Sequence, residues 1–290
     1  MPAAARPSTG TGRTGGSLAL PSYARLSMQP LHILCFLLPL LIAYEIGSVM
    51  YLTDPESGVV DTVAARSAVA TFFENFGVVG LHLPAVTLVV VLLIWHILKK
   101  DPWRIHPPVL GAMLVESALW TLPLIALAVL IQIIFGPPAG AQVSAAMGEL
   151  PVAAIPAVAP AGTPGTAEES MRMLQELPLG AKLTVAIGAG LYEELLFRMV
   201  GIAAVHLVLV DLLKLRDDTG RLMAVIITAT AFAFYHELRS EAGGLDAALF
   251  LFYALAGGLF GAVYLWRGFG IVVVVHALYD VFALTASGGV

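Results

Sequence analysis

Charged residues are scarce in this sequence of 290 residues. Asp, Glu, Lys and Arg make up 12% of the chain, about half the usual share of a soluble globular protein, whereas hydrophobic residues make up 59%. The mean hydropathy is +0.89, and several apolar runs reach about 20 residues, the length of helix that crosses a bilayer. This composition excludes an ordinary soluble protein and indicates an integral, multi-pass membrane protein.

Cysteine is almost absent, and basic residues are not in excess. Cys35 is the single cysteine, so an intrachain disulfide and a cysteine-ligated metal site are both excluded. The net charge is -5, and the sequence has no cluster of Lys and Arg that could neutralise phosphates. We therefore expect no nucleic-acid partner.

Composition divides the chain into four parts. Residues 1–30 are rich in Ala, Gly, Ser, Thr and Pro without any acidic residue, which predicts a disordered basic tail that stays attached rather than a cleaved signal peptide. Residues 31–135 predict three transmembrane helices, 136–180 a Pro- and Ala-rich extramembrane loop, and 181–286 the remaining spans. Because backbone polar groups in lipid must be paired within the segment, we expect an all-α, polytopic transmembrane helical bundle.

The number of crossings depends on one long apolar run, residues 181–213. A single helix of this length must tilt, kink or project, and splitting it near Arg198 would give eight spans instead of seven. Glycines that could allow a kink are Gly188, Gly190 and Gly201. The seven runs lie at 31–50, 79–98, 109–135, 181–213, 222–238, 245–266 and 269–286.

The distribution of Lys and Arg predicts the orientation of the spans. Basic residues gather in the N-terminal tail and in the turns at 99–107 and 214–221, whereas 136–180 is mainly acidic. The positive-inside rule then predicts a cytoplasmic N-terminus and places 136–180 on the opposite side. The Ala- and Gly-rich composition favours a bacterial inner membrane.

Ionisable side chains inside spans are functional candidates, because a central Asp, Lys or Arg costs about 2.5 to 3.5 kcal/mol even on lenient insertion scales. Most of the deep ones fall in three C-terminal clusters: Glu193, Glu194 and Arg198; His236 beside Glu237; and His276 with Asp280. Carboxylates, imidazoles and an arginine together are the parts of an acid–base site.

Helical spacing predicts roles within these clusters. Residues four apart share a face, so Glu194 can pair with Arg198, while Glu193 points about 100° away and has no cation on its own helix. An unpaired carboxylate in apolar surroundings gains proton affinity, which suits a general base. His276 and Asp280 also share a face, so Asp280 can accept the imidazole N–H and fix its tautomer.

Convergence of the three helices would let Glu193, His236 and His276 hold and activate one water. Each cluster also has a structural interpretation, because a Glu–Arg pair can be a clamp and a histidine can be a hydrogen-bonded core residue. The other histidines lack comparable companions and are expected to pack or to lie at interfaces: His32, His82, His96, His106 and His206. Glu45 and Glu116 are also intramembrane, and the sequence names no partner for either.

The three motifs resemble those of the CPBP family of intramembrane proteases, which contains the type II CAAX prenyl endopeptidases and bacteriocin-processing or immunity proteins. The resemblance rests on Glu-Glu-x-x-x-Arg at 193–198, Phe-x-x-x-His at 232–236 and His-x-x-x-Asp at 276–280, in that order on successive spans. It covers about 181–286, whereas 1–180 carries no motif that we assign.

The resemblance implies that Glu193 and His236 activate a water for peptide-bond hydrolysis, with His276 and the residue four positions later completing the site. In CAAX-cleaving members that later position is commonly Asn, proposed to help bind the oxyanion, and here it is Asp280. An ionised Asp cannot donate a hydrogen bond. Either Asp280 is protonated, or it orients His276 while another donor binds the oxyanion.

We expect no cofactor. Glu193, His236 and His276 are of types that can ligate zinc, but the sequence contains neither His-Glu-x-x-His nor a close pair of histidines. A glutamate-type mechanism without a metal fits the motifs equally well.

Two other functions remain open on the sequence. A proton-coupled transporter also places carboxylates and histidines inside its bundle, although no repeat symmetry relates the halves of this chain. A noncatalytic scaffold or immunity protein would keep the same fold, although no motif residue is missing. The expected partners are the lipid bilayer and a peptide or membrane-protein substrate, because prenylated C-terminal motifs are mainly eukaryotic and archaeal.

Overall fold

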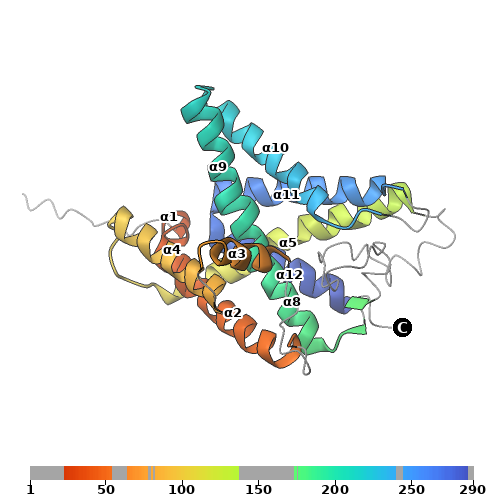
Figure 1. The fold of residues 1–290 in the computed structure, drawn as a ribbon, viewed down its shortest axis with the longest axis horizontal. Helices are drawn as coiled ribbons and strands as arrows, with labels where there is room; N and C mark the ends of the chain where they lie inside the picture. Colours follow the sequence, from red (N-terminus) through yellow and green to blue (C-terminus); the bar gives the residue numbers. More distant parts are fainter. Residues whose placement is uncertain are drawn as a thin grey trace, which may run out of the picture.

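The computed structural model describes residues 23–53, 64–77, 80, 82–136, 173–174, 176–239 and 244–286. This part of the chain is all-α and contains no strand (Figure 1). The helices are α1 (Tyr23–Ser27), α2 (Pro30–Tyr51), α3 (Ala64–Glu74), α4 (Leu83–Lys99), α5 (Pro107–Phe135), α8 (Leu179–Glu193), α9 (Ala203–His206), α10 (Asp217–Tyr235), α11 (Ala247–Arg267) and α12 (Phe269–Ala286). π-Helical segments Glu194–Ile202 and Leu207–Leu212 flank α9.

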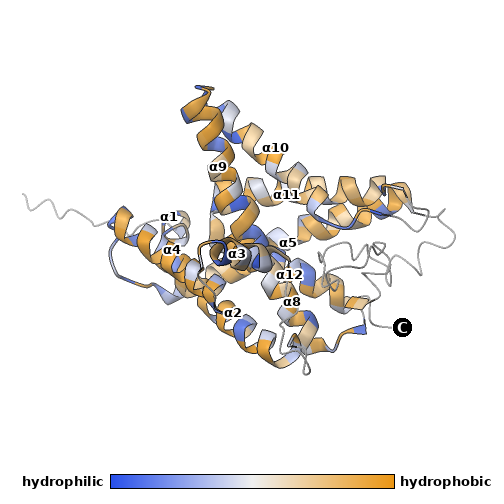
Figure 2. Cartoon of the chain, viewed as in Figure 1, coloured by the Kyte–Doolittle hydropathy of each residue, from blue (hydrophilic) through white to orange (hydrophobic). Residues whose placement is uncertain are grey.

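Five helical segments are long and apolar enough to cross a bilayer: α2, α5, the continuous segment Leu179–Leu212, α11 and α12. Figure 2 shows these helices coloured mainly for hydrophobic residues. α4 is apolar but shorter, and α10 begins with the charged pair Asp217 and Asp218. The apolar helices support an integral membrane protein.

α12 is the central helix of the bundle. All its residues from Phe269 to Ala277 are buried, because α8, α5, α11 and α2 pack around it. α10 and α11 form another closely packed pair, and α2 packs against both α4 and α8. Side chains that could be functional on α12 are therefore enclosed by protein rather than by lipid.

The long apolar run is one continuous helical segment, Leu179–Leu212. Its far end projects beyond the other helices together with the start of α10, at the top of Figure 1. Gly188 and Gly190, which the sequence offered as kink sites, lie inside regular α8. The change to π-helical geometry begins at Glu194 instead, and Gly201 lies in that segment.

The predicted disordered tail, residues 1–30, is too long at its C-terminal end. α1 is helical, and its Leu26 and Ser27 are buried. The Tyr23 hydroxyl donates to the Glu116 carboxylate at 2.5 Å. Burial and this neighbouring carboxylate raise the pKa of the Tyr23 phenol, so it stays a neutral donor. The rest of the predicted tail lies outside the described residues.

A helix also replaces part of the predicted loop between the first two spans. α3 places Ala65 and Arg66 in the protein interior, against α8 and α4. Phe72 of α3 and Phe76, just beyond the end of this helix, are exposed. Most of the predicted extramembrane segment 136–180 lies outside the described residues.

Candidate active site

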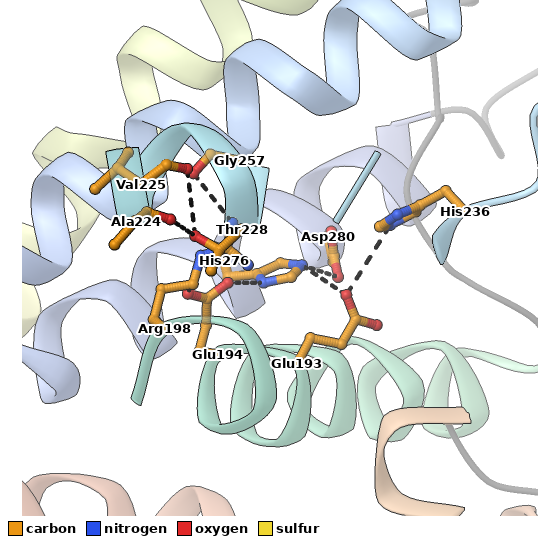
Figure 3. Close-up of polar contacts among 10 residues, drawn as sticks. All are labelled: Glu193, Glu194, Arg198, Ala224, Val225, Thr228, His236, Gly257, His276 and Asp280. Atoms are coloured by element: carbon orange, nitrogen blue, oxygen red, sulfur yellow. Dashed lines mark hydrogen bonds and ion pairs between the residues drawn. The ribbon is translucent and has the colours of Figure 1, made fainter. Parts of the chain in front are cut away.

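Three segments far apart in the sequence carry the predicted site residues. Glu193 ends α8 and Glu194 begins the π-helical segment, His236 follows the last residue of α10, and α12 supplies His276 and Asp280. All five side chains are buried, and the most exposed of these residues, His236, is only 5% exposed. Figure 3 shows them converging on one region.

Close packing of α8 against α12 brings the glutamates to the second histidine. A Cβ at Gly190 would lie 2.7 Å from the Val273 carbonyl oxygen and 3.0 Å from the Ala277 Cβ. A side chain at this position therefore requires the helices to separate. One turn later, Glu193 ends α8 and Glu194 begins the π-helical segment, and both side chains face His276 of α12.

Glu194 contacts two buried side chains, one through each carboxylate oxygen. Its Oε2 lies 3.1 Å from Arg198 Nε, as the spacing of four residues predicted. Its Oε1 lies 2.7 Å from His276 Nδ1, a contact between residues 82 positions apart. Glu194 therefore positions His276 as well as pairing with Arg198.

Aromatic rings surround the Arg198 guanidinium. Its carbon lies 4.2 Å from the centre of the Phe232 ring and 5.1 Å from that of Phe260. Its Nη2 donates to the Gly257 carbonyl oxygen at 3.3 Å. These contacts hold the arginine between the π-helical segment, α10 and α11, where cation–π attraction partly replaces hydration.

The backbone fixes the tautomer of His236. Its Nδ1 lies 2.7 Å from the Phe232 carbonyl oxygen, which can only accept, so Nδ1 carries the proton. Nε2 is then an acceptor in the neutral ring, and it is buried without a hydrogen-bond partner. The ring stacks on Tyr253, with centroids 3.8 Å apart and planes at 29°. His236 therefore presents a lone pair in a fixed direction.

Glu193 faces both histidines without reaching either. Its Oε2 is 4.0 Å from His236 Nε2 and 4.0 Å from His276 Nε2, beyond direct hydrogen-bond distance. Both its carboxylate oxygens are buried and have no hydrogen-bond partner. Glu193 is thus the unpaired carboxylate of the pair, as the helical spacing predicted.

Asp280 lies beside His276, as the spacing of four residues predicted, but Glu194 lies closer to the ring. Its Oδ2 is 3.4 Å from His276 Nε2, whereas Glu194 binds the other ring nitrogen at 2.7 Å. Helical spacing placed Asp280 near the ring, but it could not show that α8 would bring a closer carboxylate to Nδ1. Both carboxylate oxygens of Asp280 are buried without a hydrogen-bond partner.

A small cavity of about 10 Å³ lies beside His276 and Asp280, close to the size that holds one water. Its walls are mostly aromatic and also include Leu124 of α5. The other lining residues are Phe232, Phe252, Tyr253, Ala256, Phe260 and Tyr279. The α5 contribution was not recognisable from any motif.

The described residues do not form a metal site as they stand. No group of three or more His, Cys, Asp or Glu side chains within this part of the chain has an arrangement that could hold a metal ion. Glu193 lies 4.0 Å from each histidine nitrogen, wider than the roughly 3.4 Å between neighbouring ligands implied by tetrahedral zinc bond lengths. We therefore derive no step through a metal.

Two further intramembrane carboxylates gain the partners that the sequence did not name. Glu116 binds Arg267, with its Oε2 2.7 Å from Arg267 Nη2. Glu45 binds His82, and the Tyr192 hydroxyl donates to Glu45 at 3.4 Å. Both pairs join residues distant in sequence, so no helical spacing could have identified them.

The remaining histidines lie outside the site. His32 stacks on His106, with ring centroids 5.4 Å apart, and His96 meets Trp103 edge to face. His206 lies 2.9 Å from Asp217. These contacts are with residues outside the candidate site.

Comparison with family models identifies the C-terminal part of the chain. Residues 175–282 match the family described as Type II CAAX prenyl endopeptidase Rce1-like. The matched segment includes all six predicted site residues. Comparisons with curated proteins and with solved structures give no match. Residues 175–282 are therefore similar to the Rce1-like type II CAAX prenyl endopeptidases, in agreement with the resemblance that the three motifs carry.

Proposed function

We propose that this protein is an intramembrane endopeptidase in which Glu193 and His236 hold and activate the water that hydrolyses a peptide bond. One observation carries the proposal. Glu193 Oε2 and His236 Nε2 face each other 4.0 Å apart in the interior, and neither has a hydrogen-bond partner. Two buried acceptors in this arrangement require a shared donor.

The 4.0 Å separation of these acceptors suits one shared water molecule. A water oxygen about 2.8 Å from each atom subtends an angle of about 90° between them, close to the angle between the two O–H bonds of water. The water would donate one hydrogen to each acceptor, and its lone pairs would point away from both. His236 is suited to this task because its own N–H is held by the Phe232 carbonyl.

The reaction then needs one proton acceptor that returns the proton. The water oxygen bonds to the carbonyl carbon of the scissile peptide while its proton passes to Glu193, and the carbonyl oxygen takes up the negative charge. The C–N bond of the tetrahedral intermediate breaks as its nitrogen takes the proton from Glu193. The products are a new carboxyl terminus and a new amino terminus, and Glu193 returns to its starting state.

Glu194, Arg198 and His276 position the reacting groups in this proposal. With Nδ1–H donated to Glu194, a neutral His276 would turn the Nε2 lone pair toward two further carboxylates, Asp280 and Glu193. An imidazolium instead offers them an N–H. The imidazolium and Arg198 together carry two positive charges against the three buried carboxylates of Glu193, Glu194 and Asp280. The site then has one net negative charge, which the proton released by water can neutralise.

We propose that the enzyme works without a resident metal, since the Glu and His side chains can perform the water activation and proton transfer. The proposed substrates are peptides or membrane proteins that reach the site from the bilayer. The family description makes a prenylated C-terminal peptide a second candidate. Assays of the purified protein in lipid nanodiscs, with matched prenylated and unprenylated fluorogenic peptides, distinguish these substrate classes.

The same assay tests the function. We expect cleavage by the wild-type protein, loss of cleavage in Glu193→Gln, and less than about a twofold change after treatment with a strong chelator. A transporter or a noncatalytic scaffold would give no cleavage by the wild-type protein. Inactivation by the chelator with recovery on adding zinc would contradict the metal-free mechanism.

We also propose seven crossings, with α4 and α10 adding to the five longer apolar segments, in a bacterial inner membrane with the N-terminus in the cytoplasm. Thr219 is exposed in the first turn of α10, within the basic segment 214–221. In a Cys35→Ser background, a cysteine placed at Thr219 should resist an impermeant thiol reagent in intact cells and react after lysis. Labelling in intact cells would contradict both the orientation and the crossing count.

A further inference from the structure

The oxyanion of the tetrahedral intermediate needs a hydrogen-bond donor, and most polar groups of this site cannot be one. Glu193, Asp280 and the His236 Nε2 atom are acceptors. The proposed Nε2–H of His276 faces carboxylates. Arg198 is held by Glu194 and by two phenylalanine rings, and although its Nη1 has no hydrogen-bond partner, Arg198 does not line the cavity. We therefore consider the donors of the cavity wall.

Tyr253 on α11 has the right chemistry and location. It is 5% exposed and stacks on His236 at 3.8 Å, so its ring is fixed next to the histidine that holds the proposed water. It also lines the water-sized cavity beside His276 and Asp280. A neutral phenol is a donor that a carboxylate cannot replace.

We propose that the Tyr253 hydroxyl donates a hydrogen bond to the oxyanion of the tetrahedral intermediate. This role rests on the proposed peptidase function. It supplies the donor that an Asn would provide at the position of Asp280, and it leaves Asp280 to hold His276. The stacking of the ring on His236 fixes the oxyanion donor relative to the attacking water, which is the preorganisation that this kind of stabilisation requires.

The test removes the hydroxyl and keeps the ring. Tyr253→Phe preserves the stack on His236, so the melting temperature should stay within about 2 °C of wild type. We expect kcat to fall about 100-fold, the usual scale for one oxyanion donor, while KM changes less than about threefold. Tyr264→Phe, a partly buried tyrosine elsewhere on α11, is the matched control and should leave kcat unchanged.

A second variant tests the other tyrosine of the cavity. Tyr279 also lines it, so Tyr279→Phe makes the same chemical change on α12. We expect a smaller loss of kcat than in Tyr253→Phe. A larger loss in Tyr279→Phe, or wild-type kcat in a folded Tyr253→Phe, would overturn the assignment of the oxyanion donor.

Glu193→Gln separates this proposal from the proposed function. If wild type cleaves peptide, Glu193→Gln is inactive and Tyr253→Phe is fully active, only the tyrosine assignment fails. If wild type cleaves none of the peptides, or Glu193→Gln is as active as wild type, the proposed reaction fails and the tyrosine role fails with it.

Discussion

Two Glu–Arg pairs lie within the apolar helices of this protein, and their surroundings differ. Glu116 of α5 binds Arg267 at the end of α11 and also accepts from Tyr23 and Trp120. Glu194 binds Arg198 on its own helical segment. The side chains of the first pair are 11% and 20% exposed, whereas those of the second are at most 1% exposed.

Hydrogen-bond pairing separates the two regions more clearly than burial does. Among the described residues, the buried polar atoms that lack a partner include none from the Glu116 or Arg267 side chains. Around the second pair, Glu194 Oε2 meets Arg198 Nε as an ion pair, but the atoms without a hydrogen bond are concentrated there: Glu193 Oε1 and Oε2, Arg198 Nη1, His236 Nε2, Asp280 Oδ1 and Oδ2. A fully paired carboxylate holds helices together, whereas unpaired buried acceptors can accept hydrogen bonds from water or substrate.

We expect the largest loss of activity from substitution of Glu193, whose carboxylate faces the unpaired Nε2 of His236. Glu193→Gln keeps the side-chain volume but removes the proton acceptor, so activity should fall by about 100-fold or more. No cation is paired with Glu193 at short distance, so the melting temperature should change little. Peptide turnover and thermal unfolding of the same preparation measure both quantities. A Glu193→Gln protein with wild-type turnover would assign the base to another residue.

Glu194→Gln should break the fold more than Glu193→Gln does. It leaves Arg198 buried without its countercharge and weakens the bond to His276, so we expect a loss of about 3 kcal/mol in stability. Lower yield and a lower melting temperature should accompany lower activity. A stably folded but inactive Glu194→Gln, together with an active Glu193→Gln, would reverse the roles of the two glutamates.

Sequence periodicity predicted the contacts within single helices. The pairing of Glu194 with Arg198 and the proximity of His276 to Asp280 both follow from a spacing of four residues, and the structure contains both. The motif order also predicted that His236 belongs with these clusters. The predicted catalytic roles of these residues stay predictions.

Contacts between helices required the packed structure. The 2.7 Å contact of Glu194 with His276 depends on the approach of α8 to α12 at Gly190, which the sequence suggested only as a possible kink site. The partner of Glu116 is another example, because Arg267 is 151 residues away. Distant pairs have no periodic signal in one sequence, and π-helical geometry has no clear residue preference that we could use.

A glycine substitution tests whether helix approach holds the site together. Gly190→Ala places a methyl group against the Val273 carbonyl oxygen, so α8 and α12 must separate, and we expect a loss of about 1 to 2 kcal/mol. Activity should fall more than stability explains, since the glutamates move relative to His276. Gly258→Ala is the control, because a Cβ there meets nothing within 4 Å. Equal activity in the two variants would show that this contact does not position the site.

The smallest effect is expected in the fully paired region. Glu116→Gln removes the countercharge of Arg267 and leaves one amide oxygen, which can replace the acceptor of Tyr23 or that of Trp120 but not both, and the pair is partly exposed. We therefore expect a loss of about 1 kcal/mol in stability, less than in Glu194→Gln. Turnover per folded molecule should equal that of wild type, because Glu116 binds α1 and the end of α11 rather than any residue of the candidate site. Thermal unfolding and turnover normalised to folded protein check both statements. A large loss of normalised turnover in Glu116→Gln would mean that the fully paired Glu116 also affects catalysis. Hydrogen-bond pairing would then not distinguish structural from catalytic carboxylates in this protein.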